Sequence, residues 1–245
     1  MKVTILGTCG GIPIPNRVQS GVLVENDSFK MLFDCGSGVP LRLSEAGVAA
    51  EEIDLLCLTH GHLDHIQDLP SISKAAWIKT DKAEYDIICP PELVNKVPDW
   101  WKSVEEWERV DLDIIPMDDG DIKEINTFVL KAFDTPHRPE SQGYKIESEG
   151  NSVVYTGDTS ANKNIRDVAQ GCNLLIHELS LPMKTDLHTS PEELIDLLDG
   201  LEIDKLVLTH FYPQILDELE DISKNIENKT GVKTIVGEDL MYFEF

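Results

Sequence analysis

The sequence has no long apolar run and no pair of cysteines at metal-binding spacing. A helix that crosses a bilayer needs about 20 mostly apolar residues, and no stretch of the chain approaches that length. The cysteines are odd in number and far apart, which argues against a disulfide framework and a zinc knuckle. They are Cys9, Cys35, Cys57, Cys89 and Cys172. We therefore expect a cytoplasmic chain with no membrane segment, in which the cysteines are small buried side chains.

Basic residues are also scarce. The chain has 21 Lys and Arg against 45 Asp and Glu, which gives a formal net charge of -24. Proteins that bind a long RNA draw much of their affinity from cations that neutralise phosphates, and this balance leaves no global field to attract a polyanion. A long RNA is therefore not an expected partner, because its binding would need a local basic patch.

What the sequence does contain is a series of short runs rich in Val, Ile, Leu and Phe. Thirteen of them have the length and composition of β-strands, and amphipathic stretches separate several of them. They are residues 2–8, 21–24, 29–35, 55–59, 86–89, 112–117, 127–133, 143–146, 152–157, 174–177, 206–209, 234–236 and 241–245. Because each sheet must bury an apolar face, we predict an α/β fold of the αββα sandwich type, with two mixed sheets face to face and helices outside.

Two stretches predict helices, residues 191–198 and residues 215–226. The first follows Ser190, a favoured N-cap, and carries Glu192 and Glu193 in its first turn. We find no linker, short-period repeat or low-complexity segment, so residues 1–245 are predicted to form one domain.

The least regular stretch covers residues 90–111, where Trp100, Trp101 and Trp107 stand in a charged segment that we expect to be helical. These aromatic side chains allow several interpretations. They could stack on a single base or cover the entrance of a site, and they could equally form part of the core or of a homodimer contact.

The densest group of candidate ligands is His60-Gly61-His62-Leu63-Asp64-His65, which directly follows a predicted strand. Imidazole and carboxylate are ligands that zinc, iron and manganese accept. A single His is usually structural, but three with an Asp in six residues are improbable by chance. The segment predicts a metal-binding loop at the end of a strand.

Three further candidates also follow predicted strands: His137, Asp158 and His210. Each taken alone could be an ordinary polar loop residue. A rigid site is best assembled where a sheet directs several loops to one place. Together with the His60 to His65 segment, four groups of possible ligands follow predicted strands in this chain, which favours a shared metal site.

These motifs resemble the metallo-β-lactamase superfamily, and within it ribonuclease Z and its relatives. The resemblance runs over nearly the whole chain. The matching segments are Phe33-Asp34-Cys35-Gly36, His60 to His65, His137 with Gly143-Tyr144, Tyr155-Thr156-Gly157-Asp158-Thr159, Ile176-His177-Glu178, His188-Thr189-Ser190 and Leu208-Thr209-His210-Phe211.

The resemblance implies a hydrolase with two divalent metal ions, zinc or alternatively manganese or iron. It places His60, His62 and His137 on one ion and Asp64, His65 and His210 on the other, with Asp158 as the bridge. Such a pair would hold a hydroxide as the nucleophile and stabilise the charge that develops on a phosphorus centre.

The resemblance also implies catalytic residues. It suggests that His188 contacts the scissile phosphate and protonates the leaving oxygen, and that Glu178 orients it; Asp64 is counted with them. A plainer interpretation is that His188 merely precedes a helix. Asp34 is expected to hold a ligand His by a hydrogen bond.

The sequence departs from ribonuclease Z in one place. That family usually carries a protruding arm that grips tRNA, often between the third-motif His and the bridging Asp, yet only twenty residues separate His137 from Asp158. We therefore predict a phosphodiesterase that acts on a small or nucleotide phosphodiester. Three alternatives are hydrolysis of a carboxylic ester, lactone, thioester or sulfate ester; tRNA 3′ processing; and a non-catalytic binding protein on the same fold.

Overall fold

The computed structural model describes residues 1–103, 107–138 and 141–245, and their strands form two seven-stranded sheets. The chain divides into two compact units, each of which holds one sheet. Unit 1 consists of Met1–Met117 and Asp239–Phe245, and unit 2 consists of Asp118–Glu238. The prediction of two mixed sheets is confirmed, whereas that of a single domain over residues 1–245 stays a prediction.

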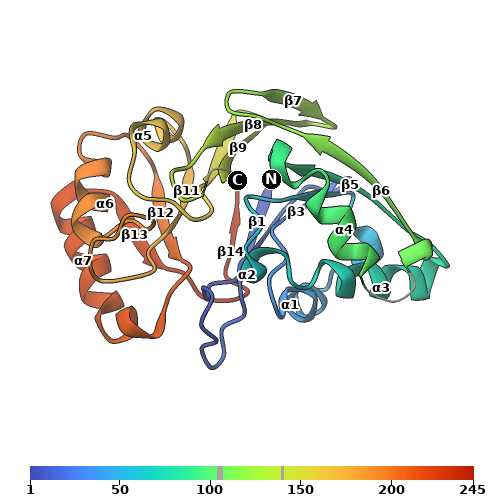
Figure 1. Cartoon of the computed structure of the whole chain (residues 1–245). Helices are drawn as coiled ribbons and strands as arrows, with labels where there is room; N and C mark the ends of the chain where they lie inside the picture. The colour runs from blue at the N-terminus through green and yellow to red at the C-terminus, as the bar shows by residue number, and fades with distance from the viewer. Residues whose placement is uncertain (104–106, 139–140) are drawn as a thin grey trace. The chain divides into compact units, whose positions relative to one another are not determined.

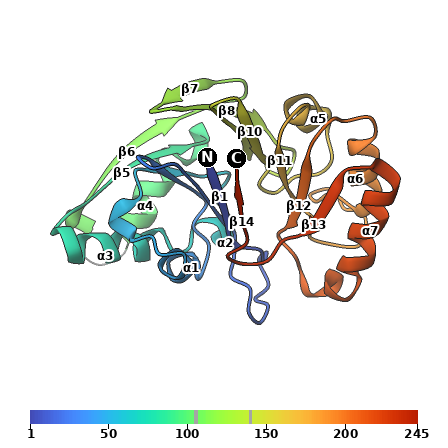
Figure 2. The ribbon, with the colours of Figure 1, turned by 180° about the vertical axis from the view of Figure 1, so that it is seen from behind.

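The sheet of unit 1 is antiparallel on one side and parallel on the other. Its strands, in spatial order, are β14 (Tyr242–Glu244), β1 (Lys2–Gly7), β2 (Gly21–Glu25), β3 (Lys30–Phe33), β4 (Leu55–Cys57), β5 (Ala83–Cys89) and β6 (Val110–Pro116). Pairing is antiparallel from β14 to β3 and parallel from β3 to β6. Figure 2 shows β1 and β14 side by side near the two chain ends. Since β3 and β4 are parallel neighbours, the residues that follow them emerge at the same edge.

The sheet of unit 2 repeats this plan. Its order is β13 (Lys233–Val236), β12 (Lys205–Thr209), β11 (Leu174–Glu178), β10 (Asn151–Tyr155), β9 (Gln142–Ser148), β8 (Phe128–Asp134) and β7 (Ile122–Ile125). Strands β10 to β13 are parallel, and β7 to β10 are antiparallel. Strand β8 therefore runs in the same direction as β10, β11 and β12, so all four end at one edge.

In unit 1 the helices bury the apolar face of the sheet. They are α1 (Val39–Glu45), α2 (Leu63–Ile66), α3 (Leu69–Thr80) and α4 (Lys96–Lys102), with 3₁₀ turns at Ala50–Glu52, Pro91–Leu93 and Trp107–Arg109. Helix α1 packs against β1 and α3 against β5 (Figure 1). The core between helices and sheet is fully buried and includes Leu23, Leu56, Ile72 and Ile87.

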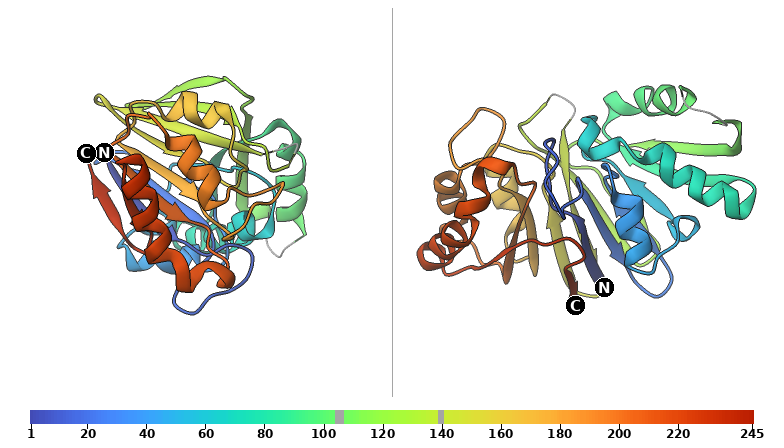
Figure 3. Two further views of the ribbon diagram at one scale, coloured as in Figure 1. Left: turned by 90° about the vertical axis from the view of Figure 1, so that its left-hand side faces the viewer. Right: turned by 90° about the horizontal axis from the view of Figure 1, so that it is seen from below.

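In unit 2 the helices are α5 (Lys163–Ala169), α6 (Pro191–Leu198) and α7 (Leu219–Thr230), preceded by a 3₁₀ segment at Pro213–Glu218. Helix α6 packs on α7, and α7 on β13 (Figure 3, left). The helix predicted at 191–198 is confirmed, with Ser190 and Glu193 forming a reciprocal capping box. The helix predicted at 215–226 begins in the 3₁₀ segment and becomes α-helical at Leu219.

One strand escaped sequence analysis. Strand β7 reads Ile-Lys-Glu-Ile, is half-buried or exposed throughout, and lies at the edge of its sheet. An exposed edge strand needs little apolar character, which removes the signal used for the other strands. The segment 90–111, predicted as helical, consists of short helices up to Lys102 and a 3₁₀ turn from Trp107, followed by β6; residues 104–106 lie outside the described part. In the described ranges no helix is both long and apolar enough to cross a membrane.

Candidate metal centre

In unit 1 the buried carboxylate of Asp34 organises the histidine loop. Asp34 follows β3 and has a left-handed backbone, with φ of 57°, a conformation that costs a non-glycine residue about 1 to 3 kcal/mol. Its Oδ1 accepts a hydrogen bond from the Thr59 amide at 2.8 Å, and its Oδ2 accepts one from Nδ1 of His65 at 2.7 Å. The Thr59 hydroxyl also donates to this carboxylate. Asp34 thus fixes both the start of the loop and one of its rings.

His60 and His62 present ring nitrogens to a common point. The Thr59 hydroxyl gives its proton to Asp34, so it accepts from Nδ1 of His60 at 3.0 Å. That leaves Nε2 of His60 unprotonated, 3.0 Å from Nδ1 of His62. Two nitrogens this close, on rings at an interplanar angle of 75°, suit a shared cation.

Asp64 and His65 lie on the short helix α2, and both are buried. His65 donates through Nδ1 to Asp34, and its Nε2 lies 3.5 Å from the hydroxyl oxygen of Ser20 and 3.9 Å from Oδ2 of Asp64. The approach of this helix requires Gly36, since a Cβ there would lie 2.1 Å from the backbone oxygen of Asp64. The His-x-His-x-Asp-His segment and Phe33-Asp34-Cys35-Gly36 therefore form one cluster within unit 1.

In unit 2 the second group of candidate residues stands at the edge where four strands end. Asp158 follows β10, Glu178 ends β11, His210 follows β12, and His137 follows β8. His210, like Asp34, has a left-handed backbone, with φ of 62°. Nε2 of His210 lies 3.1 Å from Oδ1 of Asp158, and Nε2 of His137 lies 3.7 Å from Oδ2 of the same carboxylate.

A backbone hydrogen bond fixes the ring orientation of His137. Its Nδ1 donates to the backbone oxygen of Leu187 at 2.9 Å, which leaves Nε2 unprotonated on the side of Asp158. Burial lowers the pKa of His137, with the Asp158 charge opposing this effect. A neutral imidazole with one nitrogen held by a carbonyl is the form in which His binds a metal.

Glu178, His188 and Ser180 form a buried network beside these residues. Nδ1 of His188 donates to Oε1 of Glu178 at 2.7 Å. Oε2 of Glu178 accepts from the Ser180 hydroxyl at 2.6 Å and from the Ser180 amide at 3.0 Å. Because that hydroxyl donates to Glu178, it accepts from Nδ1 of His210 at 2.8 Å. The pairing of Glu178 with His188 and the Nδ1-protonated tautomer of His210 are thus set together.

The donor chemistry of both clusters fits divalent cations. Four predicted ligand histidines donate through Nδ1 to a neighbouring oxygen and keep Nε2 as a lone-pair donor. In unit 2, Asp158, His188 and His210 each offer a ligand atom, and these atoms lie within 4.8 Å of one another. His188 therefore lies close to the predicted ligands Asp158 and His210 as well as to Glu178.

Two residues at this network, Ser180 and Tyr212, belong to none of the motifs found in the sequence. The ring of Tyr212 lies 5.8 Å from that of His210 and 6.0 Å from that of His188, centroid to centroid. Ser180 follows Glu178 by two residues, the spacing that places two side chains on the same face of an extended chain. That spacing is the signal that could have identified Ser180.

Solved structures show which fold this is. The YhfI protein of Bacillus subtilis, described as a metallo-β-lactamase fold protein, superposes with a TM-score of 0.85 at 22% identity, over 100% of this chain and 99% of that one. The short form of human tRNase Z superposes with a TM-score of 0.78 at 24% identity, again over 100% of this chain and 99% of the other. The chain therefore has the metallo-β-lactamase fold, and each unit carries one His/Asp cluster.

Sequence comparison then gives the family. The chain belongs to the family of the anti-Pycsar protein Apyc1, whose model matches residues 1–232, and it is a relative of ribonuclease Z. Ribonuclease Z of Mycolicibacterium gilvum is 31% identical, over 90% of this chain and 87% of that protein. Ribonuclease Z of Mycolicibacterium paratuberculosis is 30% identical, over 90% and 89%. The resemblance identified from the motifs is confirmed.

Proposed function

We propose that this chain is a binuclear phosphodiesterase that hydrolyses small or nucleotide phosphodiesters. In this proposal one ion is held by His60, His62 and His137 and the other by Asp64, His65 and His210, while Asp158 bridges them. The buried ligand tautomers within each unit and the family membership support this ligand set. Zinc is the proposed metal, because it accepts imidazole and carboxylate ligands together; manganese and iron share that preference in part.

The observation that carries the phosphodiesterase assignment is the Glu178–His188 pair beside Asp158 and His210. A phosphodiester presents one more anionic oxygen than a carboxylic ester does. An imidazolium next to the ligand residues suits that additional charge. The carboxylate of Glu178 accepts the Nδ1 proton of His188 at 2.7 Å and so fixes the orientation of the ring.

Two bound divalent ions supply an activated water nucleophile and a sink for transition-state charge. The chain's own residues do the rest. In the proposed imidazolium form of His188 the Nδ1 proton is held by Glu178, so the proton on Nε2 is the one that can be transferred. His188 gives that proton to the oxygen of the departing alcohol, and the neutral ring then recovers a proton from solvent. Ser180 and Thr159 keep Glu178 in position, since Oε1 also accepts from the Thr159 amide at 3.1 Å.

The proposed small substrate rests on the segment between His137 and Asp158. Strands β9 and β10 pair as a hairpin closed at Glu149-Gly150, and they take up most of this segment. Residues 139–140 lie outside the described part, yet the whole segment has only twenty residues between the two ligands. A tRNA-gripping arm has no sequence to form it here. The formal charge of -24 gives no compensating attraction for a long RNA.

An activity panel on metal-loaded protein tests the proposal. The panel contains an aryl phosphodiester, 2′,3′-cyclic and 3′,5′-cyclic nucleotides, a lactone, an aryl sulfate and a pre-tRNA. We expect the highest kcat/KM on one of the small phosphodiesters. A protein that hydrolyses the lactone or the sulfate, but no phosphodiester, would refute the assignment.

A further inference from the structure

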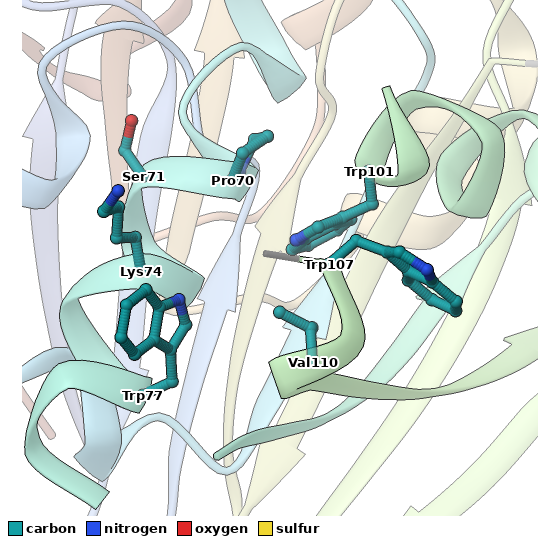
Figure 4. A pocket seen from close by; sticks show the side chains of 7 residues that line it. All are labelled: Pro70, Ser71, Lys74, Trp77, Trp101, Trp107 and Val110. Carbon is teal, nitrogen blue, oxygen red and sulfur yellow. The ribbon is translucent and has the colours of Figure 1, made fainter. Parts of the chain in front are cut away.

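Unit 1 contains a pocket of about 180 Å³ that none of the proposed metal ligands lines. It lies between α3, α4 and the 3₁₀ turn that precedes β6 (Figure 4). Its lining residues are Pro70, Ser71, Lys74, Trp77, Trp101, Trp107 and Val110. Helix α3 begins four residues after the ligand His65, so the pocket adjoins the elements that carry the histidine loop.

Trp101 gives this pocket an unused hydrogen-bond donor. Its side chain is 1% exposed, and its indole N–H has no hydrogen-bond partner among the residues that the structure describes. Figure 4 shows the ring extending from α4 toward α3 with its nitrogen at the leading end. Buried polar groups are nearly always paired in native proteins, so an unpaired donor directed into a pocket indicates a ligand that brings an acceptor.

The rest of the lining is also rich in donors and aromatic faces. Lys74 is the charged residue among the seven, and its Nζ lies 5.7 Å from the ring centroid of Trp77. The guanidinium carbon of Arg109, which lies outside the lining and pairs with Asp81, is 5.1 Å from the same ring. Nζ of Lys102, which is also outside the lining and pairs with Asp99, lies 5.5 Å from the ring of Trp107. In a chain of net charge -24, a lysine among indole rings at one pocket favours a planar ligand that carries negative charge.

We propose that this pocket binds a nucleotide, with the base among the indoles as an acceptor for the Trp101 N–H and the phosphate toward Lys74. Sites for whole drug-sized ligands measure about 300 to 1,000 Å³, so this pocket suits one ring system rather than an oligonucleotide. The inference deepens the proposed function, because it rests on nucleotides as the substrate class, and it assigns them a recognition site apart from the metal ligands.

The test measures binding of adenosine 5′-monophosphate to the metal-loaded protein by equilibrium dialysis, with ribose 5-phosphate as the probe that lacks a base. Three of the four tryptophans line the pocket, so their fluorescence reports on it. The variants are Lys74→Gln and Trp101→Phe, the second of which keeps an aromatic ring and removes the N–H. The matched control is Lys79→Gln, which makes the same charge change on α3 outside the lining.

We expect the nucleotide, but not ribose 5-phosphate, to quench the fluorescence, and we expect each pocket variant to bind it about 5- to 10-fold more weakly than wild type and Lys79→Gln do. Absence of quenching, or equal affinity in all four proteins, would overturn the inference. Lys74 is exposed, so its variant tests the site even if Trp101→Phe does not fold. Hydrolysis of an aryl phosphodiester, measured alongside, separates the two proposals: activity without pocket-dependent binding refutes the pocket alone, and binding without activity refutes the phosphodiesterase alone.

Discussion

The hydroxyl oxygen of Ser180 lies 2.8 Å from Nδ1 of His210, and both side chains are buried. The same hydroxyl donates to Glu178, which in turn holds His188. One small side chain therefore joins a proposed metal ligand to the proposed proton donor. Side chains that orient ligands from behind in this way typically contribute about 10- to 100-fold to metal affinity or activity.

We predict that Ser180→Ala lowers kcat on a phosphodiester by about 10- to 100-fold and weakens retention of metal against a chelator. The variant leaves Nδ1 of His210 without its acceptor and Glu178 without one donor. The matched control is Ser180→Thr, which keeps the hydroxyl and should retain most activity. Equal loss in both variants, with unchanged metal retention, would indicate a packing role instead.

Replacement of His188 by Ala should leave the metal content unchanged and reduce kcat on a phosphodiester by about 10²- to 10⁴-fold. The physical reason is that the proposal gives His188 a proton to transfer and no metal to hold. Metal analysis and steady-state kinetics on the same preparation check this. Loss of a metal equivalent would make His188 a ligand, as its position near Asp158 and His210 also permits. Unchanged activity would leave it as a residue that merely precedes α6.

Substrate size gives an independent prediction. The kcat/KM for pre-tRNA should be below that for the best small phosphodiester, because a large RNA needs binding energy from cations and from an element that reaches the tRNA body. The short segment from His137 to Asp158 and the acidic balance supply neither. Kinetics measured in parallel on the two substrates test this prediction. A higher kcat/KM for pre-tRNA would instead support tRNA 3′ processing as the function.

The sequence predicts the apolar strands and the motif residues of the site, but not the exposed edge strand or the contact between Ser180 and His210. The strands with apolar runs were predicted within a few residues, because their burial leaves a plain signal, whereas β7 was missed because it lies exposed at an edge. The metal motifs were identified from residue type and position after strands. The spacing of Ser180 from Glu178 is local, but nothing in the sequence shows that the same hydroxyl meets His210, which follows the neighbouring strand β12 and is distant in the chain.

His177 should make stability depend on pH. It is fully buried, its Nδ1 donates to the backbone oxygen of Glu178, and its Nε2 has no partner among the described residues. Burial lowers its pKa in the folded protein. As pH falls below about 6.5, His177 therefore takes up a proton in the unfolded chain before it does so in the folded protein. The stabilisation that neutral His177 gives the folded protein is intact above that pH and is lost below it.

As the pH falls from about 6.5 toward the pKa of His177 in the folded protein, the unfolding free energy of wild type should decrease by about 1.4 kcal/mol per pH unit more than that of His177→Gln. Urea unfolding of both proteins in a chelator, from about pH 7.5 to about pH 5, measures the difference while it keeps metal release out of the comparison. Parallel stability curves would show that His177 titrates alike in the folded and unfolded states.

The binuclear site is the centre of this account, and elemental analysis tests it most directly. Wild type loaded with zinc or manganese should hold about two equivalents per chain, because seven ligand side chains are assigned to two ions. Asp158→Ala should lose more than one equivalent, since its carboxylate is proposed to bridge both ions. The control Asp167→Ala removes a carboxylate on α5 that belongs to neither cluster and should retain two. A loaded wild-type protein that holds one equivalent or none would contradict the account.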